Sequence, residues 1–176
     1  MNDPFATLGI DPAFRIDLPA VEQRHRDLSR ALHPDKFAGA PAAERRLSLN
    51  RAIEVNEAWR AVRDPIRRAE ALMRRAGVPV GEIEEPKPSP DLLMEMMESR
   101  EALAEAAQKK DLAAVKRLGE EMSARMDATL LALGTGFAEA GADRAKLSAL
   151  LPKMGELRYI RRFLDEVSAF EEEMLV

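Results

Sequence analysis

Two helical patterns flank a short loop in the first third of the chain, and together they predict a helical hairpin. In the first pattern, side chains that can pack in a protein core recur at spacings of 3, 4, 3 and 4, which is typical of one face of an α-helix. These residues are Leu18, Val21, His25, Leu28 and Leu32. A second pattern begins after Pro41 and runs to about Arg63. The loop between them carries His33, Pro34 and Asp35.

The face of the first helix opposite its apolar stripe is mostly basic and leads into this loop. A helical wheel places Gln23, Arg26, Asp27 and Arg30 there, and Lys36 follows the tripeptide. Proline restricts the loop backbone, while the histidine and aspartate offer a donor and an acceptor side by side. Such a surface suits docking against an acidic groove of a partner. A helix-terminating turn with solvated arginines explains the tripeptide alone equally well.

Start signals for further helices recur along the chain, and the sequence predicts an all-α protein. A short turn or helix spans about residues 4–8 and stops at Gly9. An Asp or Ser cap followed closely by proline marks the starts of helices near residues 18, 65 and 90. The second of these is expected to end near Arg75. No Asn-Gly hairpin signal interrupts the Ala-, Leu-, Arg- and Glu-rich segments.

A stretch rich in proline and glycine predicts a domain boundary. Four prolines and two glycines lie between Gly77 and Pro90, a density that no helix tolerates. We therefore expect three parts: a first domain over residues 1–76, a linker over 77–89, and a second domain over 90–176. The first part carries a net positive charge and the remainder a net negative one, which favours two partners of different electrostatic character.

The second domain is expected to be an antiparallel three-helix bundle. Its helices are predicted at about 90–108, at 111–133, and from 142 to the end of the chain. Gly134 and Gly136 should disrupt the end of the middle helix, and Pro152 should break or kink the last stretch.

The helix at 91–108 carries two apolar faces. Its core stripe consists of Leu92, Met96, Ser99, Leu103 and Ala106. Leu93, Met94 and Met97 point away from this stripe, and the charged residues Glu98, Arg100 and Glu101 surround them. An exposed apolar patch of this kind marks an interaction site, and methionines suit an adaptable partner surface. Burial of both faces within the bundle explains the same pattern, and the residues alone do not decide between the two.

Composition narrows the classes of function. The chain has no cysteine and only two histidines, so we expect no disulfide, metal site or thiol chemistry and no cofactor. No nucleophile–base pair or phosphate-binding glycine loop indicates an enzyme. A net charge of −4 argues against a nucleic-acid partner. Without a signal peptide or a membrane-spanning run, the expected location is cytoplasmic.

Several separated motifs resemble those of one known family. The first part resembles the J domain, the module that couples co-chaperones to DnaK-type ATPase chaperones. The segments His33–Phe37, Val55–Trp59 and Asp64–Glu70 are more narrowly similar to the HscB branch, whose members serve iron–sulfur cluster assembly. Leu93–Glu95 with Arg100 and Glu101, and Leu157–Tyr159, extend the similarity through the second part.

The resemblance implies an adaptor with two ends and no catalytic residue of its own. At one end, His33, Pro34 and Asp35 would stimulate ATP hydrolysis by a DnaK/HscA-type chaperone, with Arg26, Arg30 and Lys36 assisting the docking. At the other end, an iron–sulfur cluster scaffold protein (IscU-like) would bind Leu93, Met94, Met97, Glu98, Arg100, Glu101, Arg158 and Tyr159. His25 and Trp59 are expected in the core, with Asn56 as a buried hydrogen-bonding residue that braces the loop. The alternative is a general J-domain co-chaperone whose acidic bundle holds a different client.

Overall fold

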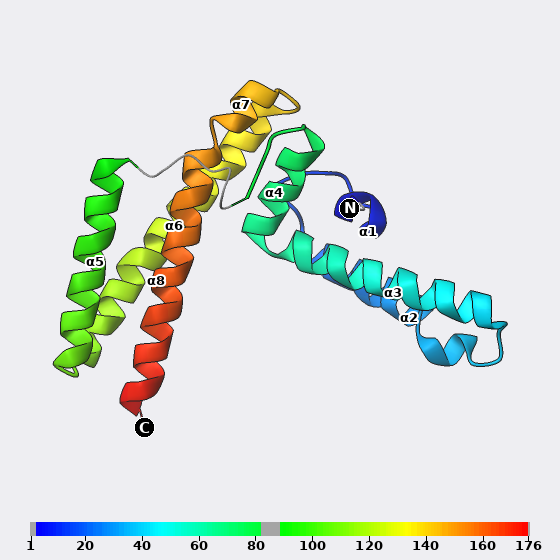
Figure 1. Cartoon of the computed structure of the whole chain (residues 1–176), viewed down its shortest axis with the longest axis horizontal. Helices are drawn as coiled ribbons and strands as arrows, with labels where there is room; N and C mark the ends of the chain where they lie inside the picture. The colour runs from blue at the N-terminus through cyan, green and yellow to red at the C-terminus, as the bar shows by residue number, and fades with distance from the viewer. Residues whose placement is uncertain (1–2, 82–88, 176) are drawn as a thin grey trace. The chain divides into compact units, whose positions relative to one another are not determined.

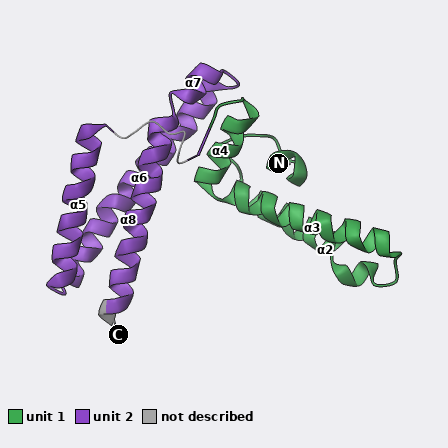
Figure 2. Cartoon of the chain, in the orientation of Figure 1, with its two compact units in different colours: residues 1–79 green, residues 80–176 purple. Residues whose placement is uncertain are grey.

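The computed structural model describes residues 3–81 and 89–175, and these are helical, with no strand among them. The chain divides into two compact units, residues 1–79 and residues 80–176 (Figure 2). Unit 1 contains α1 (Pro4–Leu8), α2 (Leu18–Ala31), the 3₁₀ helix η1 (Pro34–Phe37), α3 (Ala42–Arg63) and α4 (Pro65–Arg75). Unit 2 contains α5 (Pro90–Gln108), α6 (Leu112–Ala140), α7 (Arg144–Ser148) and α8 (Leu151–Leu175) (Figure 1). The all-α prediction is confirmed.

The predicted start signals at Asp17, Asp64 and Ser89 act as helix caps, and three further helices start with caps of the same kind. The side chains of Asp3, Asp17, Asp64, Ser89, Asp111 and Asp143 each accept a hydrogen bond from a backbone N–H in the first turn of the helix that follows. Such a bond satisfies one of the four donors that a helix leaves unpaired at its start. Proline occupies the first turn of α1, α2, α4 and α5, where it has no helical hydrogen bond to lose.

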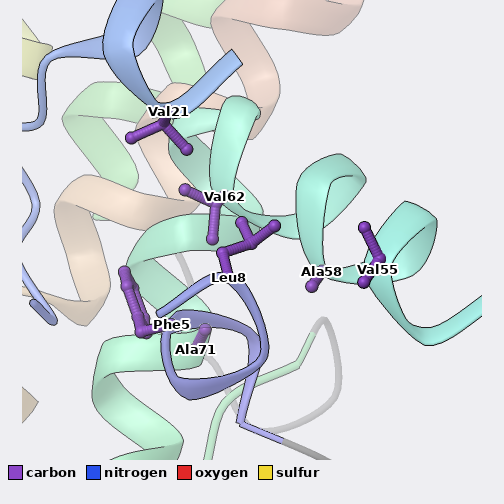
Figure 3. Close-up of a cluster of buried hydrophobic side chains, with 7 residues drawn as sticks. All are labelled: Phe5, Leu8, Val21, Val55, Ala58, Val62 and Ala71. Carbon is purple, nitrogen blue, oxygen red and sulfur yellow. The ribbon is translucent and has the colours of Figure 1, made fainter. Parts of the chain in front are cut away.

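In unit 1, α2 and α3 form the expected hairpin, and α1 and α4 pack against α3. The core lies where these helices meet (Figure 3) and consists of Phe5, Leu8, Val21, Val55, Ala58, Val62 and Ala71. Leu28, Leu32 and Trp59 pack against this core while remaining partly exposed. Leu18, predicted to belong to the core stripe, is 40% exposed because it lies in the first turn of α2.

In unit 2, α5, α6 and α8 form the three-helix bundle. Successive long helices run in opposite directions, so α5 and α8 are parallel to each other (Figure 1). The core contains Leu103, Ala106, Val115, Met122, Ile160, Phe163 and Val167. α7 is a short helix that packs against α6.

The middle helix is longer than the sequence predicted. The expectation that Gly134 and Gly136 would disrupt it is wrong, because α6 continues to Ala140. A Cβ atom at Gly136 would approach Leu150 Cδ2 to 2.5 Å. Glycine destabilises the interior of a helix. At this position the missing side chain allows α6 and the segment before α8 to approach closely. The break expected near Pro152 falls at residues 149–150, between α7 and α8, and Pro152 lies in the first turn of α8.

Gly141 ends α6 with φ 54° and ψ −116°, a conformation that residues with a side chain rarely adopt. Nothing lies within 4 Å of a Cβ built there, so the cost of alanine would come from the backbone alone. We expect Gly141→Ala to lower the free energy of unfolding by about 1–2 kcal/mol. Gly39→Ala is the control, since that site is equally open but lacks positive φ. Urea denaturation would contradict this account if the two variants were equally stable.

Candidate functional site

The His33-Pro34-Asp35 loop is exposed and locally ordered. His33 caps η1, and its Nδ1 accepts a hydrogen bond from the backbone N–H of Asp35 at 3.3 Å. The side chains of His33 and Asp35 are 59% and 90% exposed. An Nδ1 that accepts this bond leaves the proton of a neutral ring on Nε2. The loop therefore presents one ring donor and one carboxylate acceptor to solvent.

Contacts between α2 and α3 hold the hairpin on which the loop sits. Ser48 Oγ donates to the carbonyl of Leu32 at 3.1 Å, directly before the loop. Further along, the His25 ring stacks on Trp59 with centroids 5.3 Å apart, and its Nε2 lies 2.9 Å from Asn56 Oδ1. His25 and Trp59 are half-buried. The prediction of a buried Asn56 is wrong: it is exposed, and its partner is His25 rather than the loop.

The basic face of α2 lies where the sequence predicted it. Arg26 and Arg30 are exposed and form ion pairs within α2, with Glu22 at 3.4 Å and with Asp27 at 3.8 Å. Exposed pairs of this kind contribute about 1 kcal/mol or less, so a partner's carboxylates can replace them at little cost. Lys36 is also exposed, one residue past the tripeptide. These cations and the loop thus belong to one continuous end of the hairpin.

The second candidate face lies on α5. Leu93, Met94 and Met97 are 46%, 60% and 65% exposed, whereas Leu103 and Ala106 on the opposite side are buried. The structure therefore decides between the two interpretations of this helix, because the bundle covers only the core stripe. We call Leu93, Met94 and Met97 the α5 patch. Glu98 and Glu101 beside it are exposed.

Tyr159 and Arg100 join α8 to the edge of the α5 patch. The Tyr159 hydroxyl donates to the carbonyl of Met96 at 2.7 Å, and the Arg100 guanidinium lies over the Tyr159 ring, 5.6 Å from its centroid. Arg100 Nη2 also bonds Glu166 Oε1 at 2.6 Å. Burial raises the pKa of the Tyr159 hydroxyl. Tyr159 is thus half-buried, and it connects α8 to α5 through Met96 and Arg100.

Arg158 is placed differently from the other predicted scaffold-binding residues. Neighbouring side chains on a helix point about 100° apart. Since Tyr159 reaches toward α5, Arg158 points away from that direction. Of the eight predicted residues, the six on α5 are exposed, whereas Arg158 and Tyr159 on α8 are half-buried.

Sequence reasoning missed a charged group beneath the patch. Arg125 on α6 bonds Glu156 on α8, with Nε 2.9 Å from Oε1, and also bonds Glu95 on α5. The hydrogen bond with Glu95 is the largest cause that raises the pKa of the Arg125 guanidinium. Its partners lie 30 and 31 residues away along the chain. No local spacing pattern indicates such a trio, and only an isolated arginine amid Met122, Ala124 and Met126 hints at it.

The described residues provide neither a metal-binding cluster nor a membrane-spanning helix. Among residues 3–81 and 89–175, no group of three or more His, Cys, Asp or Glu side chains is arranged to hold a metal ion. No helix in the same ranges is long and apolar enough to cross a membrane.

Known proteins match both units. Residues 88–168 match the family model of the HscB C-terminal oligomerisation domain. The chain is 32% identical over 169 residues to a co-chaperone HscB homologue of Neisseria meningitidis, covering 96% of this chain and 99% of that protein. It is 34% identical over 161 residues to one from Burkholderia multivorans, covering 92% and 89%.

Solved structures agree with the sequence relatives. HscB of Vibrio cholerae matches with a TM-score of 0.86 at 26% identity, over 98% of this chain and 99% of that one. Human HscB matches with a TM-score of 0.84 at 22% identity, over 96% and 82%, and shares the fold.

Proposed function

Since the chain belongs to the HscB family of co-chaperones, we propose that it couples an ATPase chaperone to an iron–sulfur cluster scaffold protein. The loop end of unit 1 stimulates ATP hydrolysis by a DnaK/HscA-type chaperone, and the α5 patch binds the scaffold. The observation that carries this proposal is the exposure of the α5 patch in a bundle whose opposite α5 face is buried. A two-ended adaptor needs such a second surface, whereas a bare ATPase activator does not.

The loop end has the chemistry that docking to an acidic groove requires. Arg26, Arg30 and Lys36 supply positive charge that steers the approach of a negative surface. His33 and Asp35 then offer directional hydrogen bonds from an ordered turn. The chaperone performs the hydrolysis, and these residues act on it by binding.

The α5 patch has the chemistry of a client-binding surface. Two methionines and a leucine adapt to an irregular apolar partner. Glu98 and Glu101 at its border favour basic side chains around the apolar centre of that partner. The proposed scaffold contacts are Leu93, Met94, Met97, Glu98, Arg100 and Glu101 on α5, with Arg158 and Tyr159 on α8.

Steady-state ATPase assays test the whole proposal. Addition of the chain should raise hydrolysis by the chaperone, and adding both the chain and the scaffold protein should raise it beyond the sum of the separate effects. Stimulation without this synergy would favour the alternative, a general J-domain co-chaperone with another client. Failure to stimulate at all would contradict both.

The basic face of α2 should contribute through charge. We expect the double change Arg26→Gln and Arg30→Gln to raise the half-maximal concentration for ATPase stimulation about 3- to 10-fold at low salt. The difference should shrink near 1 M salt, where screening acts within about 3 Å. Arg63→Gln with Arg67→Gln is the matched control, since it removes equal charge from exposed sites of α3 and α4. Equal effects of the two doubles would exclude a local role.

A further inference from the structure

The first half of α5, which carries the α5 patch, is held to the bundle mainly by polar contacts. The buried residues of α5 are Leu103 and Ala106, both in its second half. Leu92 and Met96 face the bundle but are only partly buried. A helix segment with little buried apolar area has a small local unfolding free energy unless other bonds fasten it.

Besides the bonds from Tyr159 to Met96 and from Arg100 to Glu166, Arg125 fastens this segment and joins it to both other helices of the bundle. Its guanidinium bonds carboxylates on two different helices, Glu95 on α5 and Glu156 on α8. The arginine side chain is 31% exposed and that of Glu156 is 20% exposed. Partial burial reduces solvent screening, so the contact between Arg125 and Glu156 is stronger than a pair on the open surface. Glu95 is 54% exposed, so its contact with Arg125 is more strongly screened. The planar fork of arginine allows one side chain to hold both carboxylates, which lysine, a single point charge, does poorly.

Glu95 lies within the patch sequence, between Met94 and Met96. Fastening Glu95 therefore sets the position of the turns that carry Leu93, Met94 and Met97. We propose that Arg125 is a positioning residue for the client-binding surface: it holds the first half of α5 in place and so preorganises the α5 patch without contacting the client. Preorganisation raises affinity because less ordering remains to be done on binding.

This inference rests on the proposed function for its biological meaning, but hydrogen exchange of the free full-length protein tests its first step alone. In Arg125→Gln, amides of residues 92–98 should exchange about tenfold faster or more, while those around Phe163 should be unchanged. Arg117→Gln is the matched control, since Arg117 lies on the same helix and pairs only at 4.0 Å with Glu121 in its own helix. Unchanged exchange at residues 92–98 in Arg125→Gln would overturn the inference, as would the same change in Arg117→Gln.

Calorimetry with the scaffold protein tests the second step. Arg125→Gln should weaken binding about 5- to 10-fold, with Arg125→Lys intermediate and ATPase stimulation in the absence of scaffold unchanged. Faster exchange with unchanged affinity would overturn the positioning role, provided that a Leu93→Ala, Met97→Ala variant loses affinity. If that patch variant also bound normally, the proposed client site would be wrong. The exchange result would still decide whether Arg125 holds α5 in place.

Discussion

Replacing His33 with glutamine should remove most of the chain's stimulation of the chaperone ATPase. A central directional contact at an interface contributes about 2 kcal/mol or more, which corresponds to a loss of roughly 30-fold. His33 is exposed, and the backbone N–H of Asp35 donates to its Nδ1, which leaves Nε2 as the ring nitrogen open to a partner. Glutamine retains a polar group but not the ring geometry. The measurement is the steady-state ATPase rate as a function of co-chaperone concentration, which reports the loss of affinity.

Two further measurements separate a lost contact from a lost fold. The His33→Gln variant should keep its circular dichroism spectrum and its affinity for the scaffold protein, because the loop end lies in unit 1 and the α5 patch in unit 2. Gly39→Ala is the loop control, since an added Cβ there meets nothing within 4 Å. Stimulation by His33→Gln at the level of the wild-type chain would refute the role of the tripeptide.

The second large effect is expected at the α5 patch. Removing the side chains of Leu93 and Met97 together should weaken scaffold binding about 30- to 1000-fold, at ~1–2 kcal/mol for each anchor. Both side chains are substantially exposed in the free protein, so their truncation leaves no cavity in the bundle. The unfolding free energy should therefore change by about 0.5 kcal/mol or less. Isothermal titration calorimetry measures the first quantity and urea denaturation the second.

Leu131→Ala is the control for this prediction. Leu131 lies on α6 of the same unit and is 64% exposed, so it matches Met97 in accessibility while lying on a different helix. Tyr159→Phe is a milder probe of the border, because it removes only the hydroxyl that bonds the carbonyl of Met96. Scaffold affinity that is lost equally in Leu131→Ala and in the patch variant would show that the effect is not specific to α5.

Most helix starts could be predicted because their signals are local. Asp17, Asp64 and Ser89 each accept a bond from an N–H three residues ahead, so cap and helix occur within one turn of sequence. The end of α6 was not predictable in this way. Gly136 tolerates its helical position beside Leu150, a contact that depends on how the chain returns after Gly141. A rule that treats glycine as a helix breaker uses the local sequence alone and cannot take this contact into account.

The candidate surfaces were likewise predictable only where the signal is local. Helical periodicity indicates which side chains of α2 and α5 share a face, and the exposure of Arg26, Leu93 and Met97 agrees with it. Periodicity does not indicate that Asn56 stays at the surface beside His25. Nor does it indicate that the Tyr159 hydroxyl on α8 donates a hydrogen bond to the carbonyl of Met96 on α5.

The sequence by itself determined the helices, the His33-Pro34-Asp35 loop and the two-faced character of α5, because caps, periodicity and turn residues act over a few neighbouring positions. Only the tertiary structure decided that the bundle leaves the α5 patch uncovered and that Arg125 joins Glu95 to Glu156 beneath it. Both outcomes depend on how helices about 30 residues apart pack. The strength of the ionic contacts also depends on burial, which no single helix possesses before the bundle forms.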